Sequence, residues 1–520
     1  MFQKVYSGGI WGIDGFLVSV EADIHDGLPG FHMTGNLSQE TREAQERVRT
    51  ALRNAGFRLP AKKVVVNLSP ADVRKEGTAY DLAVAAAVLG ALGQLPSDAF
   101  RDAMVIGELG LDGRVKGVRG VLSLTAAARQ RGLKRCFLPR ENAAEGEIEG
   151  GIQIIPAESI QQLAEICKNQ RKLDTLGFSR EDEALWKKTM EEKEDAEVNY
   201  DVDFSEVNGQ PLLRRATEIA VAGRHNILYI GPAGSGKTMA AKRIPTIMPP
   251  LSREESVKIS KIYSICGLLP PQSPLIRSRP FRNPHHTITP GALAGGGAYP
   301  KPGEISLASG GVLFLDELPE FSGKAIEILR QPLEEKEVRI SRLHQVCTFP
   351  ADTVLAAACN PCPCGFYPGP RCTCSPWQIK RYIGRISRPI LDRIDITVEA
   401  SPVSYEEFRG EHENESSARI RERVIRVKEI QEKRFLSSPK IRYNGEMGVK
   451  EIRQYCRLDQ KGESYLQEIY QKLQLSARGC HKILKVARTI ADLEGKREID
   501  RIHLWEAAGY RSLEEKYWRG

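Results

Sequence analysis

One eight-residue stretch, GPAGSGKT at positions 231–238, limits the folds open to this chain more than any other feature. It lies between an apolar run, NILYI, and a segment with the pattern of a helix. Glycines let backbone N–H groups approach a phosphate without a side chain in the way, and the helix start adds its positive dipole end. The pattern G-x-x-x-x-G-K-[ST] in this context predicts a phosphate-binding loop in an α/β domain.

We expect the predicted loop and two acidic residues to form an ATP site, in which each residue has its own role. The loop consists of Gly231, Pro232, Ala233, Gly234, Ser235, Gly236, Lys237 and Thr238. We expect Lys237 to reach the β and γ phosphates and Thr238 to hold Mg²⁺. A second apolar run, VLFLDE, ends in Asp316 and Glu317. Asp316 is expected to orient the Mg²⁺ shell, and Glu317 to polarise the attacking water.

A third apolar run, TVLAAA, leads into the stretch CNPCPCG. If this run is a strand of the same sheet, Asn360 emerges at its carboxyl end beside the two acids. An amide there can hydrogen-bond both the γ-phosphate and the attacking water. Asn360 also starts an Asn-Pro turn, which is compatible with that role.

Five of the 11 cysteines lie between positions 359 and 374. Four of them, in the pattern C-x-C, seven residues, C-x-C, offer thiolates for one tetrahedral zinc site; they are Cys362, Cys364, Cys372 and Cys374. The usual knuckle is C-x₂-C, and the shorter step strains that geometry. A reduced loop with redox-labile thiols therefore stays open as the alternative, while Cys359 is expected to pack in the core.

At 520 residues the chain is too long for one hydrophobic core, and its pattern predicts several α/β and helical segments. Residues 1–167 alternate strands and helices, 168–204 form a charged linker, 205–400 form a second α/β block with parallel strands, and 401–520 are helical. We expect strands at KVVVNLSP, ILYI, VLFLD, TVLAAA and RIDITVEA, and a hairpin at GELGLDGRV.

The composition says more about where the protein is located than about which molecules it binds. Lys plus Arg is 75 and Asp plus Glu is 67, and this net charge of +8 permits contact with a polyanion without requiring one. The N-terminus lacks the apolar core of a signal peptide, and the longest apolar stretch, 82–93, is too short to span a bilayer. We expect a soluble, cytoplasmic protein with reduced thiols and no membrane partner.

The phosphate loop occurs together with RPFRNPHHTITPGALAGGG, PKPGEISLASGGVLFLDELPEF, LRQPLEEKEVRISR, CNPCPCG, LDRIDI and SARGCHKILKVARTIADLEG. In these motifs the chain resembles the YifB/ComM group of magnesium-chelatase-like AAA+ ATPases over nearly its whole length. KVVVNLSPADVRKEGTAYDLAVAAAVLGALG is similar to that group and, more distantly, to the peptidase domain of Lon. The resemblance implies a Lon-like (ribosomal S5 domain 2-like) N-terminal domain, a central AAA+ P-loop NTPase domain and a C-terminal helical lid.

The same resemblance implies a homohexameric ring that uses ATP and Mg²⁺ between neighbouring subunits. Arg393 matches the arginine finger that reaches the neighbour's γ-phosphate, although an ion pair with Asp392 or Asp395 is the structural alternative. Arg478 matches the sensor-2 arginine that couples the lid to the nucleotide, although it could be a solvated residue at a helix start.

Two loops in this family point into the ring's pore, and both carry cations here. Lys301, Arg339 and Arg342 are the resulting candidate DNA contacts, with two ordinary solvated loops as the alternative. The resemblance implies a motor that remodels single-stranded or branched DNA, as in branch migration during natural transformation. A magnesium-chelatase motor subunit and a nucleotide-switched scaffold are the competing interpretations.

Some positions depart from the related patterns. Ala233 stands where the family has proline, and Arg388 stands where it has glycine, with no assigned role for that cation. On the Lon pattern the nucleophile position is Ala79 and the lysine position falls near residues 122–124, so a peptidase is not expected. His285 and His286 are expected in a turn or in packing rather than as metal ligands.

Overall fold

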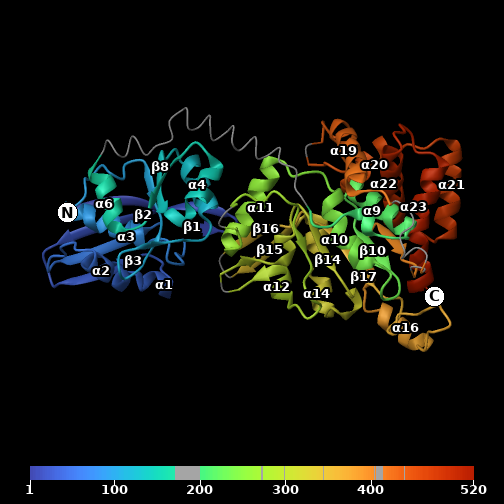
Figure 1. The fold of residues 1–520 in the computed structure, drawn as a ribbon, viewed down its shortest axis with the longest axis horizontal. Coiled ribbons are helices and arrows are strands. Elements are labelled where there is room, and N and C mark those ends of the chain that lie inside the picture. Colours follow the sequence, from blue (N-terminus) through green and yellow to red (C-terminus); the bar gives the residue numbers. More distant parts are fainter. Residues whose placement is uncertain are drawn as a thin grey trace. The chain divides into compact units, whose positions relative to one another are not determined.

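The computed structural model describes residues 1–169, 200–270, 273–297, 299–342, 345–402, 405, 414–438 and 440–519. Most of the predicted linker therefore lies outside the described residues. The chain divides into two compact units, Met1–Glu197 with Ser252–Arg277, and Val198–Leu251 with Ser278–Gly520 (Figure 1). Within the described ranges, every helix is too short or too polar to cross a membrane.

The first unit contains a mixed seven-stranded sheet in the order β3-β4-β2-β1-β5-β8-β9. Its strands are β1 (Phe2–Trp11), β2 (Asp14–His25), β3 (Gly30–Thr34), β4 (Lys63–Ser69), β5 (Ala103–Val105), β8 (Arg135–Pro139) and β9 (Gln153–Ala157). The predicted strand at KVVVNLSP is confirmed as β4, and the predicted hairpin is confirmed as the antiparallel pair β6 (Glu108–Leu109) and β7 (Val115–Lys116).

Helices cover both faces of this sheet because successive strand residues point to opposite sides. Val105 and Phe137 belong to the core shared with α2 (Ala44–Asn54), α3 (Asp81–Ala91) and α6 (Ile160–Lys168). Their neighbours Met104 and Cys136 belong to a second core with α4 (Val121–Gln130). The longest apolar stretch of the sequence is therefore the buried helix α3.

A helix from the middle of the chain, α11 (Arg253–Cys266), packs in this first unit. By sequence, this segment falls inside the expected central domain. The Ser264 hydroxyl donates to the buried carboxylate of Glu145, and Lys261 pairs with Glu149 at 3.1 Å. Burial raises the pKa of the Glu145 carboxyl. The chain thus leaves the second unit after Leu251 and returns at Ser278.

The second unit contains a five-stranded parallel sheet in the order β11-β14-β17-β10-β18. Its strands are β10 (Ile227–Ile230), β11 (Phe281–Arg282), β14 (Val312–Leu315), β17 (Val354–Cys359) and β18 (Ile396–Glu399). The predicted parallel arrangement is confirmed. This order places β17 between β10 and β14, so the residues that follow these three strands meet at one edge of the sheet.

The C-terminal segment is helical, as predicted. Its helices are α19 (Ser417–Arg434), α20 (Val449–Tyr455), α21 (Gln460–Lys472), α22 (Ala477–Leu493) and α23 (Arg501–Glu514). The apolar face of α22, with Ile483, Val486 and Ile490, shares one core with β10 and with α9 (Pro211–Gly223). The helices therefore form one compact unit with the sheet.

Candidate nucleotide site

The phosphate loop leaves β10 and enters α10 (Lys237–Ile247). A Cβ atom at Gly231 would lie 2.3 Å from the carbonyl oxygen of Ala400, so this close approach of two backbones requires glycine. Gly234 and Gly236 have φ angles of 76° and 83°, which L side chains rarely adopt. The sequence therefore folds here into a turn whose N–H groups are free of side-chain cover.

Lys237 is 7% exposed and its ammonium group is held by the loop itself. Nζ donates to the carbonyl oxygens of Gly231 and Pro232, both at 2.7 Å, and to Oδ1 of Asn360 at 3.3 Å. Burial lowers the pKa of the Lys237 ammonium, while nearby acidic groups, among them Asp316, oppose that shift. The cation is thus preorganised beneath the loop, where phosphate oxygens can replace the carbonyl groups as acceptors.

Asp316 follows β14, whose residues are fully buried, and it reaches across to the loop. The Thr238 hydroxyl donates to Oδ2 of Asp316 at 2.7 Å. A hydroxyl and a carboxylate oxygen in contact are donors of the hard type that Mg²⁺ prefers. These two residues therefore fit a Mg²⁺ site next to the phosphate loop.

Glu317 has an unusual backbone conformation, with a φ of 52°. Its backbone N–H donates to Oδ1 of Asp316 at 2.9 Å, and the Glu317 side chain is 55% exposed. A non-glycine residue in this left-handed region costs free energy, and such residues gather at functional sites. An exposed carboxylate therefore follows directly after a fully buried strand.

His286 lies in a turn, as predicted, but its contact with Glu317 was not foreseen from the sequence. Its Nδ1 lies 3.5 Å from Oε2 of Glu317, and its ring lies 4.1 Å from the ring of His285. The two histidines follow β11 and Glu317 follows β14, the neighbouring strand in the sheet. The side chains of His286 and Glu317 therefore extend from the same edge. No residue spacing links positions 286 and 317, and only the strand order could have revealed the pair.

The two predicted arginines lie elsewhere on the same unit. Arg393 is in the turn before β18, and its guanidinium contacts the carbonyl oxygen of Arg330 at 2.9 Å and the carboxylate of Glu334 at 2.8 Å. Arg393 therefore pairs with Glu334 instead of with Asp392 or Asp395. Arg478 is exposed in the first turn of α22.

Both arginines belong to the amino edge of the sheet, opposite the phosphate loop. The Asn226 amide, directly before β10, donates to the carbonyl oxygen of Arg393 at 2.8 Å. One turn beyond Arg478, Lys482 donates to the carbonyl oxygen of Ile394 at 2.7 Å. Strands rise about 3.3 Å per residue, so the four residues of β10 separate the two edges by about 10 Å.

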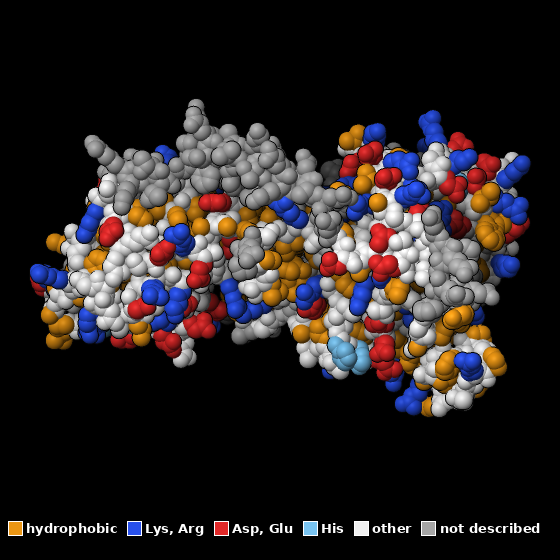
Figure 2. Space-filling model, viewed as in Figure 1, with side chains coloured by type: hydrophobic (Ala, Val, Ile, Leu, Met, Phe, Trp, Pro, Cys, Tyr) orange, Lys and Arg blue, Asp and Glu red, His pale blue; other side chains and the backbone are white. Residues whose placement is uncertain are grey.

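The candidate DNA contacts lie on two small hairpins. Lys301 is exposed in β13 (Lys301–Pro302), which pairs with β12 (Gly295–Gly296). Arg339 lies in β15 (Glu337–Arg342), which pairs with β16 (Gln345–Pro350), and its guanidinium is 3.4 Å from the Glu337 carboxylate. The Arg342 side chain lies outside the described set. On the face drawn in Figure 2, basic and acidic side chains are interspersed.

The Lon-type serine and lysine are both absent from their positions. Position 79 is alanine, and residues 122–124 are Leu122, Ser123 and Leu124, all buried in α4. Close by, the buried Asp81 carboxylate forms a bidentate pair with Arg47 at 2.9 and 3.0 Å. Burial raises the pKa of the Asp81 carboxyl, although the ion pair with Arg47 opposes that shift.

Comparisons with known proteins extend over nearly the whole chain. Family models match at residues 20–142 (subunit ChlI of Mg-chelatase), 203–408 (magnesium chelatase, subunit ChlI) and 414–511 (magnesium chelatase, subunit ChlI C-terminal). The competence protein ComM of Haemophilus influenzae is 39% identical over 518 residues, which are 98% of this chain and 97% of that protein.

Two further relatives match this chain to different extents, one over nearly its whole length and one over a part of it. The YifB protein of Salmonella typhimurium is 38% identical over 512 residues, which cover 98% of this chain and 97% of that protein. Lon protease 2 of Bacillus subtilis is 33% identical over 127 residues, which cover 24% of this chain and 22% of that protein. With near full-length matches to ComM and YifB and a magnesium-chelatase model over its phosphate-loop domain, the chain belongs to the YifB/ComM group of magnesium-chelatase-like AAA+ ATPases.

Proposed function

We propose that the protein is an ATP-hydrolysing motor that assembles into a homohexameric ring and remodels DNA. The observation that carries the ATPase proposal is the convergence of five residues at one edge of the parallel sheet. These residues are Lys237, Thr238, Asp316, Glu317 and Asn360. They derive from three neighbouring strands and include a cation, a metal-ligand pair, a carboxylate and an amide, as phosphoryl transfer requires.

Each residue has a distinct task in that reaction. Lys237 binds the β and γ phosphates, and Asn360 donates its amide N–H to a γ-phosphate oxygen while its Oδ1 orients the water. Glu317 polarises that water for in-line attack. Thr238 and Asp316 would hold Mg²⁺, and the ion would supply positive charge to the phosphate oxygens.

A ring is proposed because one chain supplies only part of the site. The guanidinium of Arg393 lies at the amino edge of the sheet and contacts Arg330 and Glu334, so it does not reach its own phosphate loop. In a head-to-tail ring, a side chain at this edge faces the neighbour's nucleotide and can spread the transition-state charge. Arg478 lies toward the same edge, so its proposed coupling of the helical lid to the nucleotide would also act across the interface.

Mixed assemblies test the shared site. Arg393→Ala and Lys237→Ala each inactivate a different half-site, so each protein alone is expected to lack ATPase activity. Mixing them restores interfaces in which both halves are intact, and we expect partial recovery. A mixture that stays as inactive as its components, although it forms mixed rings by size analysis, contradicts a shared site.

Two observations support the proposed DNA substrate: the 39% identity to a competence protein, which favours a role in natural transformation, and the cations Lys301 and Arg339 on the two hairpins. ATPase rates measured with and without single-stranded and branched DNA, followed by a branch-migration assay, test this proposal. Stimulation that weakens with salt is expected. ATP hydrolysis indifferent to DNA favours the chelatase-type or scaffold functions.

A further inference from the structure

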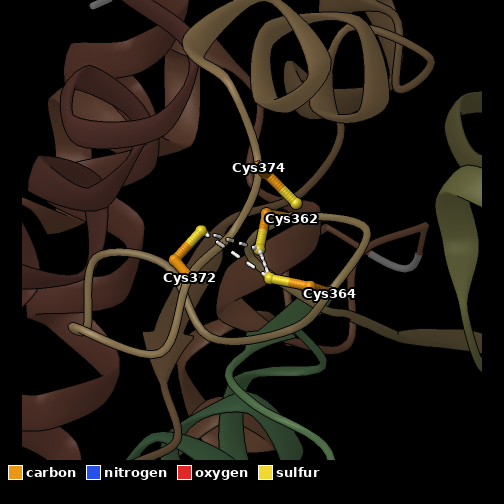
Figure 3. Close-up of side chains that lie close together, drawn as sticks. All are labelled: Cys362, Cys364, Cys372 and Cys374. Atoms are coloured by element: carbon orange, nitrogen blue, oxygen red, sulfur yellow. Dashed lines mark hydrogen bonds between the residues drawn. The ribbon is translucent and has the colours of Figure 1, made fainter.

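Four cysteine side chains converge in the loop after β17, here called the cysteine knuckle: Cys362, Cys364, Cys372 and Cys374 (Figure 3). Their sulfur atoms all lie within 4.8 Å of one another. The separations are 3.4 Å between Cys362 and Cys364, 3.8 Å between Cys362 and Cys372, and 3.6 Å between Cys364 and Cys372.

These distances match the edges of a metal-centred tetrahedron. Zinc–sulfur bonds are about 2.3 Å long, and a regular tetrahedron with that radius has edges of about 3.8 Å. A disulfide needs about 2.05 Å between sulfurs, and all four cysteines are free thiols. Sulfurs this close surround one ion and leave no room for a multi-iron cluster.

A glycine turn in the backbone of the knuckle lets the cysteine side chains converge. Gly365 has a φ of 83°, and its N–H donates to the carbonyl oxygen of Cys362 at 3.0 Å, which turns the chain so that the C-x-C step can converge. The strain expected from a C-x-C step is therefore relieved by a glycine turn.

We propose that the cysteine knuckle binds one Zn²⁺ in a closed tetrahedral site with four thiolate ligands. Four protein ligands fill the coordination shell, so the ion is structural and holds the chain between β17 and α16 (Pro376–Ile383). Tetrahedral thiolate sites suit zinc or iron, and the metal analysis below separates these two.

The position of the knuckle links this metal to the nucleotide site. Asn360 precedes the first ligand, Cys362, by two residues. A Cβ atom placed on Gly365 would lie 3.8 Å from the backbone nitrogen of Ala233 in the phosphate loop, so the two loops are in van der Waals reach. The ion therefore fixes the turn that holds Asn360 against Lys237. This consequence rests on the proposed ATPase function, whereas metal binding does not.

Elemental analysis of the full-length protein, purified without chelators, tests the proposal directly. We expect about one Zn²⁺ per chain, released when a mercurial reagent binds the four knuckle thiolates in its place. Less than about a tenth of an equivalent of any metal would overturn the proposal. About one equivalent of iron in place of zinc would overturn the zinc assignment.

Two matched variants locate the site. Cys364→Ser is expected to lose the metal, whereas Cys480→Ser, which changes a partly exposed cysteine in α22, is expected to keep it. Retention of full zinc in Cys364→Ser, or its loss in Cys480→Ser, would contradict the assignment. If Cys364→Ser fails to fold, cobalt substitution of the wild-type protein decides, because a tetrathiolate site gives strong visible absorption and other sites do not.

Activity is read separately from metal content. Removing the ion is expected to lower the ATPase kcat by at least about tenfold, with nucleotide affinity changed far less. Zinc at full stoichiometry in a protein without any ATPase activity leaves the metal proposal intact and refutes the proposed function instead.

Discussion

Replacing Glu317 with glutamine isolates the proposed chemical step from folding and binding. The substitution keeps the size of the side chain and removes its ability to polarise water. A positioned general base contributes about 10²–10⁴-fold to a rate, which corresponds to about 2.7–5.5 kcal/mol in the activation free energy. We therefore expect kcat to fall by that factor in Glu317→Gln.

Stability and ATP binding should change little in the same variant. The Glu317 side chain is 55% exposed, and its carboxylate lies 3.5 Å from Nδ1 of His286. Exposed ion pairs contribute about 0–1 kcal/mol, which is well below the expected kinetic effect. The strained φ of 52° belongs to the backbone and is unaffected by a Glu→Gln change.

The assay combines steady-state ATPase rates with nucleotide binding by calorimetry, at saturating Mg²⁺. Glu320→Gln serves as the matched control, because Glu320 lies in the next turn and pairs with Arg385 at 2.8 Å on the surface. The control should keep the wild-type rate. A Glu317→Gln protein that turns over ATP within about threefold of wild type would refute the assignment of the base.

Three further perturbations have defined outcomes. His286→Ala should lower kcat about tenfold without changing the apparent Mg²⁺ affinity, because it frees the catalytic carboxylate to adopt other rotamers; an unchanged rate removes His286 from the site. Gly231→Ala should abolish nucleotide binding in calorimetry and cost about 1–3 kcal/mol in unfolding free energy, because its Cβ would clash with a carbonyl oxygen at 2.3 Å. Burial raises the pKa of the Asp352 carboxyl, but Arg224 and a neighbouring lysine outweigh burial and lower the pKa to about 2 from 3.8. This depressed pKa contributes stability above about pH 4 that is lost toward pH 2. The Asp352→Asn variant should therefore unfold about 2 °C below wild type at pH 7 and at the same temperature as wild type near pH 2. An equal difference in unfolding temperature at both pH values would contradict the pairing.

Much of the nucleotide site could be predicted from local patterns. The loop 231–238 needs glycine for its φ angles and close backbone approach, and apolar runs mark the strands on which Asp316 and Asn360 are placed. These features depend on neighbours within a few residues, and for that reason they can be read directly along the chain. The resemblance to a family then added the ring and its arginines.

Other features depended on contacts between distant segments. The packing of α11 in the first unit and the pairing of His286 with Glu317 have no counterpart in residue spacing. The pattern of the four knuckle cysteines left both zinc and a reduced loop open. The structure brings all four sulfurs within 4.8 Å of one another, and three of them to 3.4–3.8 Å, which favours the metal.

The sequence by itself determined which residues can bind phosphate, polarise water and ligate a metal, because those capacities belong to side-chain types and short backbone turns. Tertiary structure alone decided which of them meet. The insertion of β17 between β10 and β14 brings Asn360 to Lys237, and the location of Arg393 at the opposite edge keeps it away from its own loop. Strand order arises from burial of apolar faces across the whole sheet, and no local pattern encodes it.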